Sequence, residues 1–168
     1  MLLLIIYVLF SFLLEGFMSN IFASSLTDVS YFTTIYTVIS FVVIYPYFYN
    51  KRKYYILLII FGILFDALYT STFIVNVFIF LGIGFVIYLL NNILSDNIFM
   101  INIISIIAII TYHLLSFIIL SIAGYANYSF LLLGRIIVHS IIMTIIYTSL
   151  SYLVIKTLFN RFDIKEIK

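Results

Sequence analysis

The chain lacks cysteine and has few charged residues, and both features limit what the protein can be. Its 168 residues include 8 Lys or Arg and 6 Asp or Glu, so charged residues make up 8% of the sequence. Soluble domains carry about 25% charged residues, so a water-soluble domain is excluded. The absence of cysteine excludes disulfides, thiol chemistry and cysteine-ligated metals.

The sequence also lacks the motifs that mark common catalytic and nucleotide-binding sites. It contains no His-Glu-x-x-His, no Gly-x-Ser-x-Gly nucleophile elbow and no glycine-rich phosphate loop. Its histidines and acids are scattered, so we expect no metal site and no cofactor. The basic residues form no extended patch, which argues against a nucleic-acid partner. We therefore expect a protein that is not an enzyme.

Hydrophobic residues make up 66% of the chain and occur in runs long enough to cross a bilayer. A transmembrane helix needs about 20 apolar residues. We predict an all-α membrane protein with six transmembrane helices in one bundle, and Pro46 is its only proline. The predicted spans of this single domain, 1–168, are 2–22, 31–49, 54–70, 73–90, 98–123 and 136–159, followed by a short cytoplasmic tail at 160–168.

The basic residues predict how the bundle is oriented. Lys51, Arg52 and Lys53 follow the second span, and a second basic group, beginning at Lys156, closes the chain. With six spans both groups lie on one side, and the positive-inside rule makes that side cytoplasmic. Both termini are then inside the cell, and the basic groups also attract anionic membrane lipid.

Asp66 is the most informative single residue because it lies within the apolar run 54–70. An acid at the centre of a membrane helix costs roughly 2.5–3.5 kcal/mol on insertion scales, so such residues usually have a function. The alternative is a buried carboxylate that only fixes helix packing, bonded to Tyr69 or to a neighbouring hydroxyl. Glu15 in the first span raises the same two alternatives.

Topology places the other ionisable residues near the same depth. At 1.5 Å per residue, Glu15, Asp66 and His113 lie roughly 20 Å from the cytoplasmic edge of a core about 30 Å thick. Arg135 lies near the outer edge, where it either extends to the lipid headgroups or pairs with Asp66. His113 and His139 are either neutral, hydrogen-bonded core residues or parts of a polar centre.

Polar residues also recur on single faces of four predicted helices. Spacings of three or four residues place them on one side of a helix. These faces predict a polar centre that opens toward the outside, unless the small polar residues serve only helix packing. The groups are Ser11, Glu15 and Ser19; Thr33, Thr37 and Ser40; Gly62, Asp66 and Tyr69; and Asn102, Ser105, Tyr112 and Ser116.

The third span contains Gly62-x-x-x-Asp66, and a small polar turn and a glycine-containing fourth span with Gly82 follow it. In these features the two spans resemble the family of the rod shape-determining protein MreD. Glu15, the basic loop after the second span and the basic tail also match the family layout. The fifth span departs from it, because His113 stands where the family often has an acid.

The resemblance implies a non-enzymatic subunit of the bacterial cell-elongation machinery (the elongasome) in the cytoplasmic membrane. Its direct partner would be an MreC-like protein, and its indirect partners MreB filaments, RodA and a class B penicillin-binding protein. It would support peptidoglycan synthesis and rod cell shape. The family is also thought to share the fold of the substrate-binding S-component of energy-coupling-factor transporters. Asp66, Gly62, Glu15, Tyr69 and Gly82 would then organise the bundle or bind the partner.

Two alternatives remain at the level of sequence. The first is the substrate-binding subunit of a vitamin transporter, which usually needs an alanine-rich face on its first helix. Residues 2–14 are instead large and branched, and Ala23 is the only alanine near them. The second is a membrane enzyme acting on lipid-linked precursors, for which Asp66 would be essential to turnover.

Overall fold

The computed structural model describes residues 2–22, 34–70, 72–94, 97–124 and 129–161, and these form helices joined by turns. This confirms the predicted all-α class. The elements are α1 (Leu2–Ile21), α2 (Tyr36–Ile44), the 3₁₀ turn η1 (Tyr45–Tyr47), α3 (Lys51–Phe65), the π-helical turn η2 (Asp66–Thr70), α4 (Val75–Asn91), α5 (Ile98–Ile122) and α6 (Phe130–Arg161).

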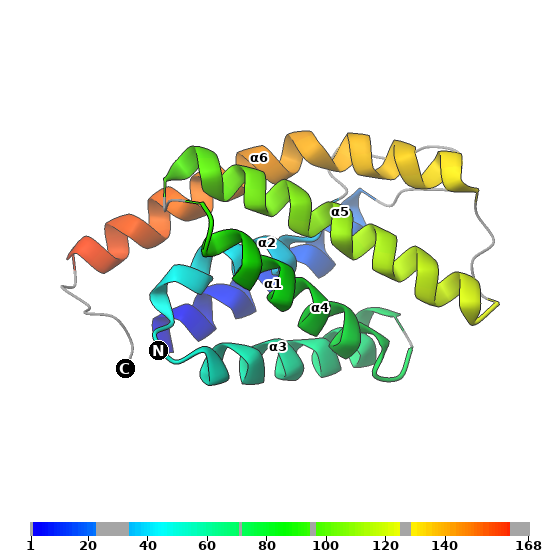
Figure 1. Ribbon diagram of the computed structural model, residues 1–168, viewed down its shortest axis with the longest axis horizontal. Helices are drawn as coiled ribbons and strands as arrows, with labels where there is room; N and C mark the ends of the chain where they lie inside the picture. The colour runs from blue at the N-terminus through cyan, green and yellow to red at the C-terminus, as the bar shows by residue number, and fades with distance from the viewer. Residues whose placement is uncertain (1, 23–33, 71, 95–96, 125–128, 162–168) are drawn as a thin grey trace.

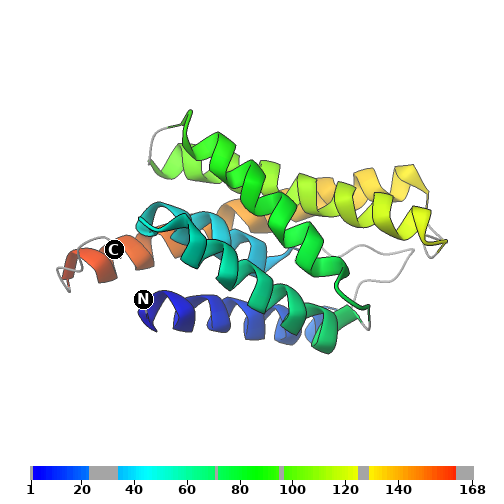
Figure 2. The same cartoon turned by 60° about the horizontal axis from the view of Figure 1, so that its bottom comes forward.

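The helices alternate in direction along one bundle axis (Figure 1). Every residue of α2 is buried, and this helix contacts α1, α4, α5 and α6. It is therefore the centre of the bundle. The ends of α5 and α6 that are joined by the 124–129 connection extend beyond the neighbouring ends of α1 and α3 (Figure 2).

Four helices are long and apolar enough to cross a membrane. They cover Leu2–Ile21, Lys51–Thr70, Ile98–Ile122 and Phe130–Asn160. The other two apolar helices, Tyr36–Tyr47 and Val75–Asn91, are shorter. At 1.5 Å per residue the first of these is about 18 Å long, well below the roughly 30 Å of a bilayer core. Four apolar helices of this length are typical of a membrane protein, whereas the count of six spans stays a prediction.

The predicted span 31–49 is too long, because the helix begins only at Tyr36 and its last turn ends at Tyr47. Its first residues, 31–33, lie outside the described part of the chain. The backbone N–H of Thr37, in the first turn of α2, donates a hydrogen bond to the Glu15 carboxylate of α1. Pro46 lies in the 3₁₀ turn that follows α2, where its fixed φ angle is tolerated but an α-helix cannot continue unbroken.

Two other helices begin earlier than predicted, and caps explain both starts. α3 begins at Lys51 because Oδ1 of Asn50 accepts a hydrogen bond from the N–H of Arg52 at 3.0 Å. α6 begins at Phe130 instead of 136, since the side-chain oxygen of Ser129 accepts a hydrogen bond from the N–H of Leu132 at 3.4 Å. Arg135 therefore lies inside α6 and does not precede it.

The described parts of the two basic groups lie at the same end of the bundle. The start of α3 and the end of α6 share the end at which α1 begins (Figure 1). Nζ of Lys51 lies 3.8 Å from the centre of the Tyr45 ring, and Nζ of Lys156 donates to the Tyr152 hydroxyl at 3.2 Å. This shared end agrees with the arrangement that the charge pattern predicts. Most of the predicted tail, residues 162–168, lies outside the described part.

Candidate functional site

Asp66 bonds the first turn of the following helix. Its side chain is 4% exposed. Oδ2 accepts from the backbone N–H of Asn76 at 3.0 Å, and Oδ1 accepts from Nδ2 of the same residue at 2.9 Å. Asn76 is the second residue of α4, whose N–H has no partner within its own helix. The carboxylate therefore caps α4, where the helix dipole also favours negative charge.

Side chains from three elements complete the bonding around Asp66. The Thr72 hydroxyl donates to Oδ1, and the Thr70 hydroxyl lies within hydrogen-bond distance of both Oδ1, at 3.3 Å, and the Thr72 hydroxyl, at 2.7 Å. The Tyr112 hydroxyl on α5 donates to Oδ1 of Asn76 at 3.2 Å. One network thus joins the end of α3, the start of α4 and the middle of α5.

Glu15 bonds the start of α2 in the same way. It is 8% exposed, and its Oε2 accepts from the Thr37 N–H at 3.2 Å and from the Thr37 hydroxyl at 2.5 Å. Thr37 is the second residue of α2, just as Asn76 is the second residue of α4. Each acid lies in one of the long apolar segments, Leu2–Ile21 or Lys51–Thr70, and caps the shorter helix that follows it.

Tyr69 joins α3 to α1 and is not the partner of Asp66. Its hydroxyl donates to the carbonyl of Phe12 at 2.7 Å. Its ring lies against Gly16, where an added Cβ would be only 2.6 Å from the Tyr69 hydroxyl oxygen. Because residues 12–16 of α1 meet Tyr69, the two capping acids lie near the same level of the bundle.

The glycines of the predicted site allow close helix contacts. A Cβ at Gly62 would lie 2.7 Å from Cα of Val77, so α3 and α4 meet there backbone to backbone. A Cβ at Gly82 would lie 3.2 Å from Cδ1 of Leu115 on α5. Gly62 therefore sets the packing of the α3–α4 pair one turn before Asp66 caps α4.

The structure does not bring Arg135 to Asp66. The side chain of Arg135 is exposed on α6, and the hydrogen bonds of Asp66 come from the α3–α4 joint and α4. His139 is half-buried on α6. His113 lies on α5 with its ring against Tyr112, and its Nε2 is buried without a hydrogen-bond partner among the described residues.

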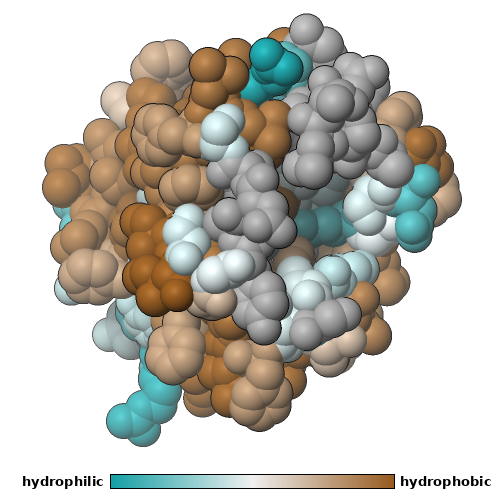
Figure 3. Space-filling view, turned by 90° about the vertical axis from the view of Figure 1, so that its right-hand side faces the viewer, coloured by the Kyte–Doolittle hydropathy of each residue, from teal (hydrophilic) through white to brown (hydrophobic). Residues whose placement is uncertain are grey.

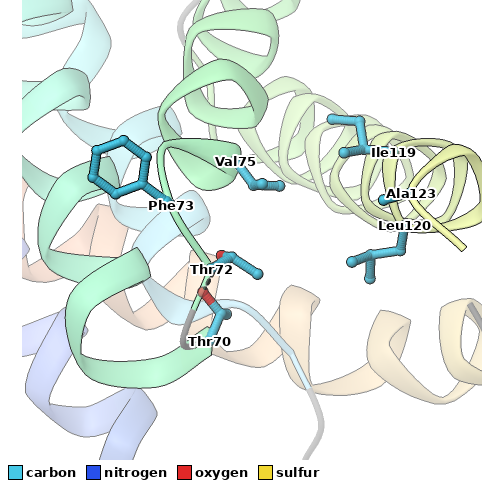
Figure 4. Close-up of a pocket in the computed structure, with 7 residues that line it drawn as sticks. All are labelled: Thr70, Thr72, Phe73, Val75, Ile119, Leu120 and Ala123. Atoms are coloured by element: carbon cyan, nitrogen blue, oxygen red, sulfur yellow. Dashed lines mark hydrogen bonds between the residues drawn. The ribbon is translucent and has the colours of Figure 1, made fainter. Parts of the chain in front are cut away.

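A groove lies beside the Asp66 network, between the α3–α4 joint and α5. Two contiguous cavities of about 510 and 380 Å³ share Thr70, Thr72, Val75 and Leu120. Figure 4 shows the two threonines on one side, facing Leu120 and Ala123 across the groove, while Phe73 points away. The smaller cavity is also lined by Asn76, His113 and Ser116. Figure 3, which shows this end of the molecule, has several pale and teal side chains among the apolar ones.

Several polar residues of the interior went unnoticed in the sequence. Asn76 is the main partner of Asp66, but a lone Asn in an apolar run gives no pattern. α6 has a clearer signal in its buried residues Ser140, Thr144, Thr148 and Ser151, spaced by three or four. Thr144 bonds Thr34 at 2.8 Å, and the neighbouring Tyr147 bonds Ser11 at 2.9 Å.

One member of the predicted polar faces does not join the interior, and another cannot be placed. Ser19 is exposed and bonds only the carbonyl of Gly16, and Thr33 lies outside the described residues. Among residues that the structure does describe, no cluster of three His, Asp or Glu side chains could hold a metal ion. The acids instead form two separate, cap-centred networks. Each acid is bonded to the start of a neighbouring helix, so the arrangement is suited to holding helices together.

Comparisons of the chain with protein-family models, with curated proteins and with solved structures give no match.

Proposed function

We propose that the chain is an MreD-like scaffold of the bacterial cytoplasmic membrane. It binds an MreC-like protein and so supports peptidoglycan synthesis and rod cell shape. In this proposal the six helices cross the membrane with both termini inside the cell. The proposal rests on the family resemblance of the third and fourth spans.

The observation that best supports a scaffold is the use of the Gly62-x-x-x-Asp66 motif. Gly62 brings α3 and α4 into backbone contact, and Asp66 bonds the start of α4. Both residues of the motif therefore build one helix pair. A catalytic carboxylate would need to reach a substrate, whereas Asp66 is 4% exposed and accepts bonds at both oxygens.

The outer faces of α1 and α6 offer surface for a partner's transmembrane helix. On α1 the side chains of Phe10, Leu13 and Phe17 are exposed, and on α6 those of Ile142 and Ile146 are exposed. Exposed apolar side chains in a bilayer meet either lipid or another helix. A partner helix would bind by close packing against one of these faces.

Co-purification from native membranes in mild detergent tests the proposal. Wild type is compared with Leu13→Ala on α1 and Ile146→Ala on α6, with partners identified by mass spectrometry. We expect an MreC-like protein with the wild type and a weaker recovery with one of the two variants. Both variants lie on the surface, so their melting temperatures should equal that of the wild type. Failure to recover any cell-elongation protein at equal expression would contradict the scaffold function.

The groove beside α5 favours a second candidate, the substrate-binding subunit of a transporter. Such a subunit needs a pocket for a small molecule, and the groove has the volume of a ligand site. Against it, the described part of α1 presents large side chains such as Leu9 and Leu13 where a docking face of alanines would be expected. Recovery of ATPase and coupling subunits in the same experiment would establish this candidate.

A further inference from the structure

We propose that the groove between the α3–α4 joint and α5 binds an organic ammonium ion with an apolar tail. This proposal goes beyond the scaffold function and does not depend on it. It rests on three features of the groove: the direction of its hydroxyl protons, its charge, and its apolar far wall.

The protons of the two threonine hydroxyls in the groove point inward, toward Asp66. The Ser116 hydroxyl in the smaller cavity has no hydrogen-bond partner among the described residues, so its oxygen is also available to accept. The Thr72 hydroxyl donates to Oδ1 of Asp66, and the Thr70 hydroxyl has its single proton engaged with either Asp66 or Thr72. Nδ2 of Asn76 donates to both Asp66 and the Thr70 oxygen. Since a hydroxyl has one proton and two lone pairs, the threonine oxygens are left to accept further bonds. A ligand with N–H donors fits this arrangement.

The charge of the groove also favours a ligand with N–H donors, because it favours a cation over an anion. No Lys or Arg is among the described residues that line the two cavities, and His113 in the smaller cavity is the only basic side chain among them. The carboxyl group of Asp66 lies directly behind the threonine hydroxyls and is bonded by neutral donors only. A negative charge in surroundings of low dielectric attracts a cation strongly and repels an anion. A carboxylate or phosphate ligand is therefore disfavoured, and an ammonium group is favoured.

The far wall of the groove is apolar. Ile119 and Leu120 of α5 and Ala123 directly after it lie opposite the threonines, and Val75 of α4 lies between the two sides. An alkyl chain on the ligand can pack there while its ammonium group bonds the threonine oxygens. Cavities of 380 and 510 Å³ are within the range of small-molecule sites.

Three six-carbon probes that differ in charge test the proposal on the full chain in lipid nanodiscs. They are hexylammonium, hexanol and hexanoate, titrated by ligand-observed NMR, with empty nanodiscs subtracted to remove partition into lipid. We expect saturable binding of hexylammonium with a Kd at least about tenfold lower than that of hexanoate.

Two variants and a control locate the binding. Leu120→Trp fills the groove from the α5 side, replaces no residue of the Asp66 network, and should weaken hexylammonium binding about tenfold. Thr72→Val removes one acceptor and should also weaken binding. Thr157→Val is the matched control, because its exposed hydroxyl bonds only its own helix, and it should bind as the wild type does.

Three results would overturn the proposal: no saturable binding above empty nanodiscs, equal or tighter binding of hexanoate, or wild-type affinity in Leu120→Trp. The scaffold function is tested separately by co-purification, so either proposal can fail without the other.

Discussion

Asp66 and Glu15 show how an acid can be accommodated inside an apolar bundle. Each carboxylate accepts a hydrogen bond from a backbone N–H that its helix cannot satisfy, at Asn76 or at Thr37. In a bilayer no water is present to bond such groups, so an unbonded helix start would cost several kcal/mol. The cost of burying the acid is thus offset by the helix start that it bonds.

Substitution of Asp66 should therefore act on stability. Asp66→Ala leaves the N–H of Asn76 and the Thr72 hydroxyl without their acceptor, and should lower the free energy of unfolding by roughly 1–3 kcal/mol. Asp66→Asn keeps one acceptor oxygen, so its free energy of unfolding should fall by less than that of Asp66→Ala. Thermal unfolding in detergent measures the stability order, which should be wild type, then Asp66→Asn, then Asp66→Ala. A melting temperature of Asp66→Ala equal to that of the wild type would show that the cap is not stabilising.

Ile74 is strained at the start of α4. Its φ angle is 64°, in the left-handed region that β-branched residues rarely adopt. This conformation costs roughly 1–2 kcal/mol in an L-residue with a Cβ. It occurs two residues before Asn76, where the chain turns from α3 into α4. The capping bonds of Asp66 help to hold the turn in place.

Ile74→Gly should raise the melting temperature, because glycine adopts this conformation without the steric cost. The gain is at most about 1 kcal/mol, since glycine also loses more backbone entropy on folding. The control is Ile145→Gly, which places the same change at an exposed position inside α6 and should lower stability by about 1 kcal/mol. Equal shifts in both variants would rule out strain at Ile74.

At the scale of elements, each acid links a long apolar segment, Leu2–Ile21 or Lys51–Thr70, to the shorter helix that follows it. α1 is bonded to α2 through Glu15, and α3 to α4 through Asp66. α2 is buried on all sides, so its length is not constrained by contact with lipid. A helix surrounded by protein can be shorter than the bilayer, because its neighbours cover its ends.

The α3–α4 pair depends on Gly62, and an alanine there should separate the two helices. The new Cβ would lie 2.7 Å from Cα of Val77, a backbone atom that cannot move aside alone. Overpacking of this kind costs about 1–3 kcal/mol. Gly134→Ala is the control, since a Cβ there meets nothing within 4 Å and alanine favours the helix. We expect a lower melting temperature for Gly62→Ala and an equal or higher one for Gly134→Ala. A reversed order would show that the close contact is absent.

At the scale of the whole molecule, the bundle has two distinct ends. The described residues of the two basic groups lie at the end where α1 and α3 begin, whereas the α3–α4 joint, which forms one side of the groove, lies toward the opposite end (Figure 1). Arg135, near the start of α6, belongs to neither group. This polarity agrees with a basic cytoplasmic end and an outer end that carries the polar residues.

The natural absence of cysteine makes the topology simple to test. Asn92→Cys places a thiol after α4 and Ala123→Cys places one after α5, and both positions are exposed. In intact cells a membrane-impermeant maleimide should label only Ala123→Cys, and both should react after lysis. Labelling of Asn92→Cys in intact cells would contradict six spans with both termini inside.

Composition and charge determined the all-α class, because apolar runs of this length can satisfy their backbone groups in a bilayer only as helices. Gly62, Asp66, Glu15 and Tyr69 were identifiable as special for the same reason, since glycine and polar groups are conspicuous in apolar helices. The placement of both acids toward one end followed from the helical rise alone.

Only the tertiary structure decided what these residues contact. The partners of Asp66 and Glu15 are helix starts, and these depend on where α2 and α4 begin, which the apolar pattern leaves open by several residues. The groove is formed by the α3–α4 joint and by α5, more than 40 positions along the chain from Asp66. Such a surface depends on how the helices pack, and the hydrophobic pattern of the sequence does not specify which helices are neighbours.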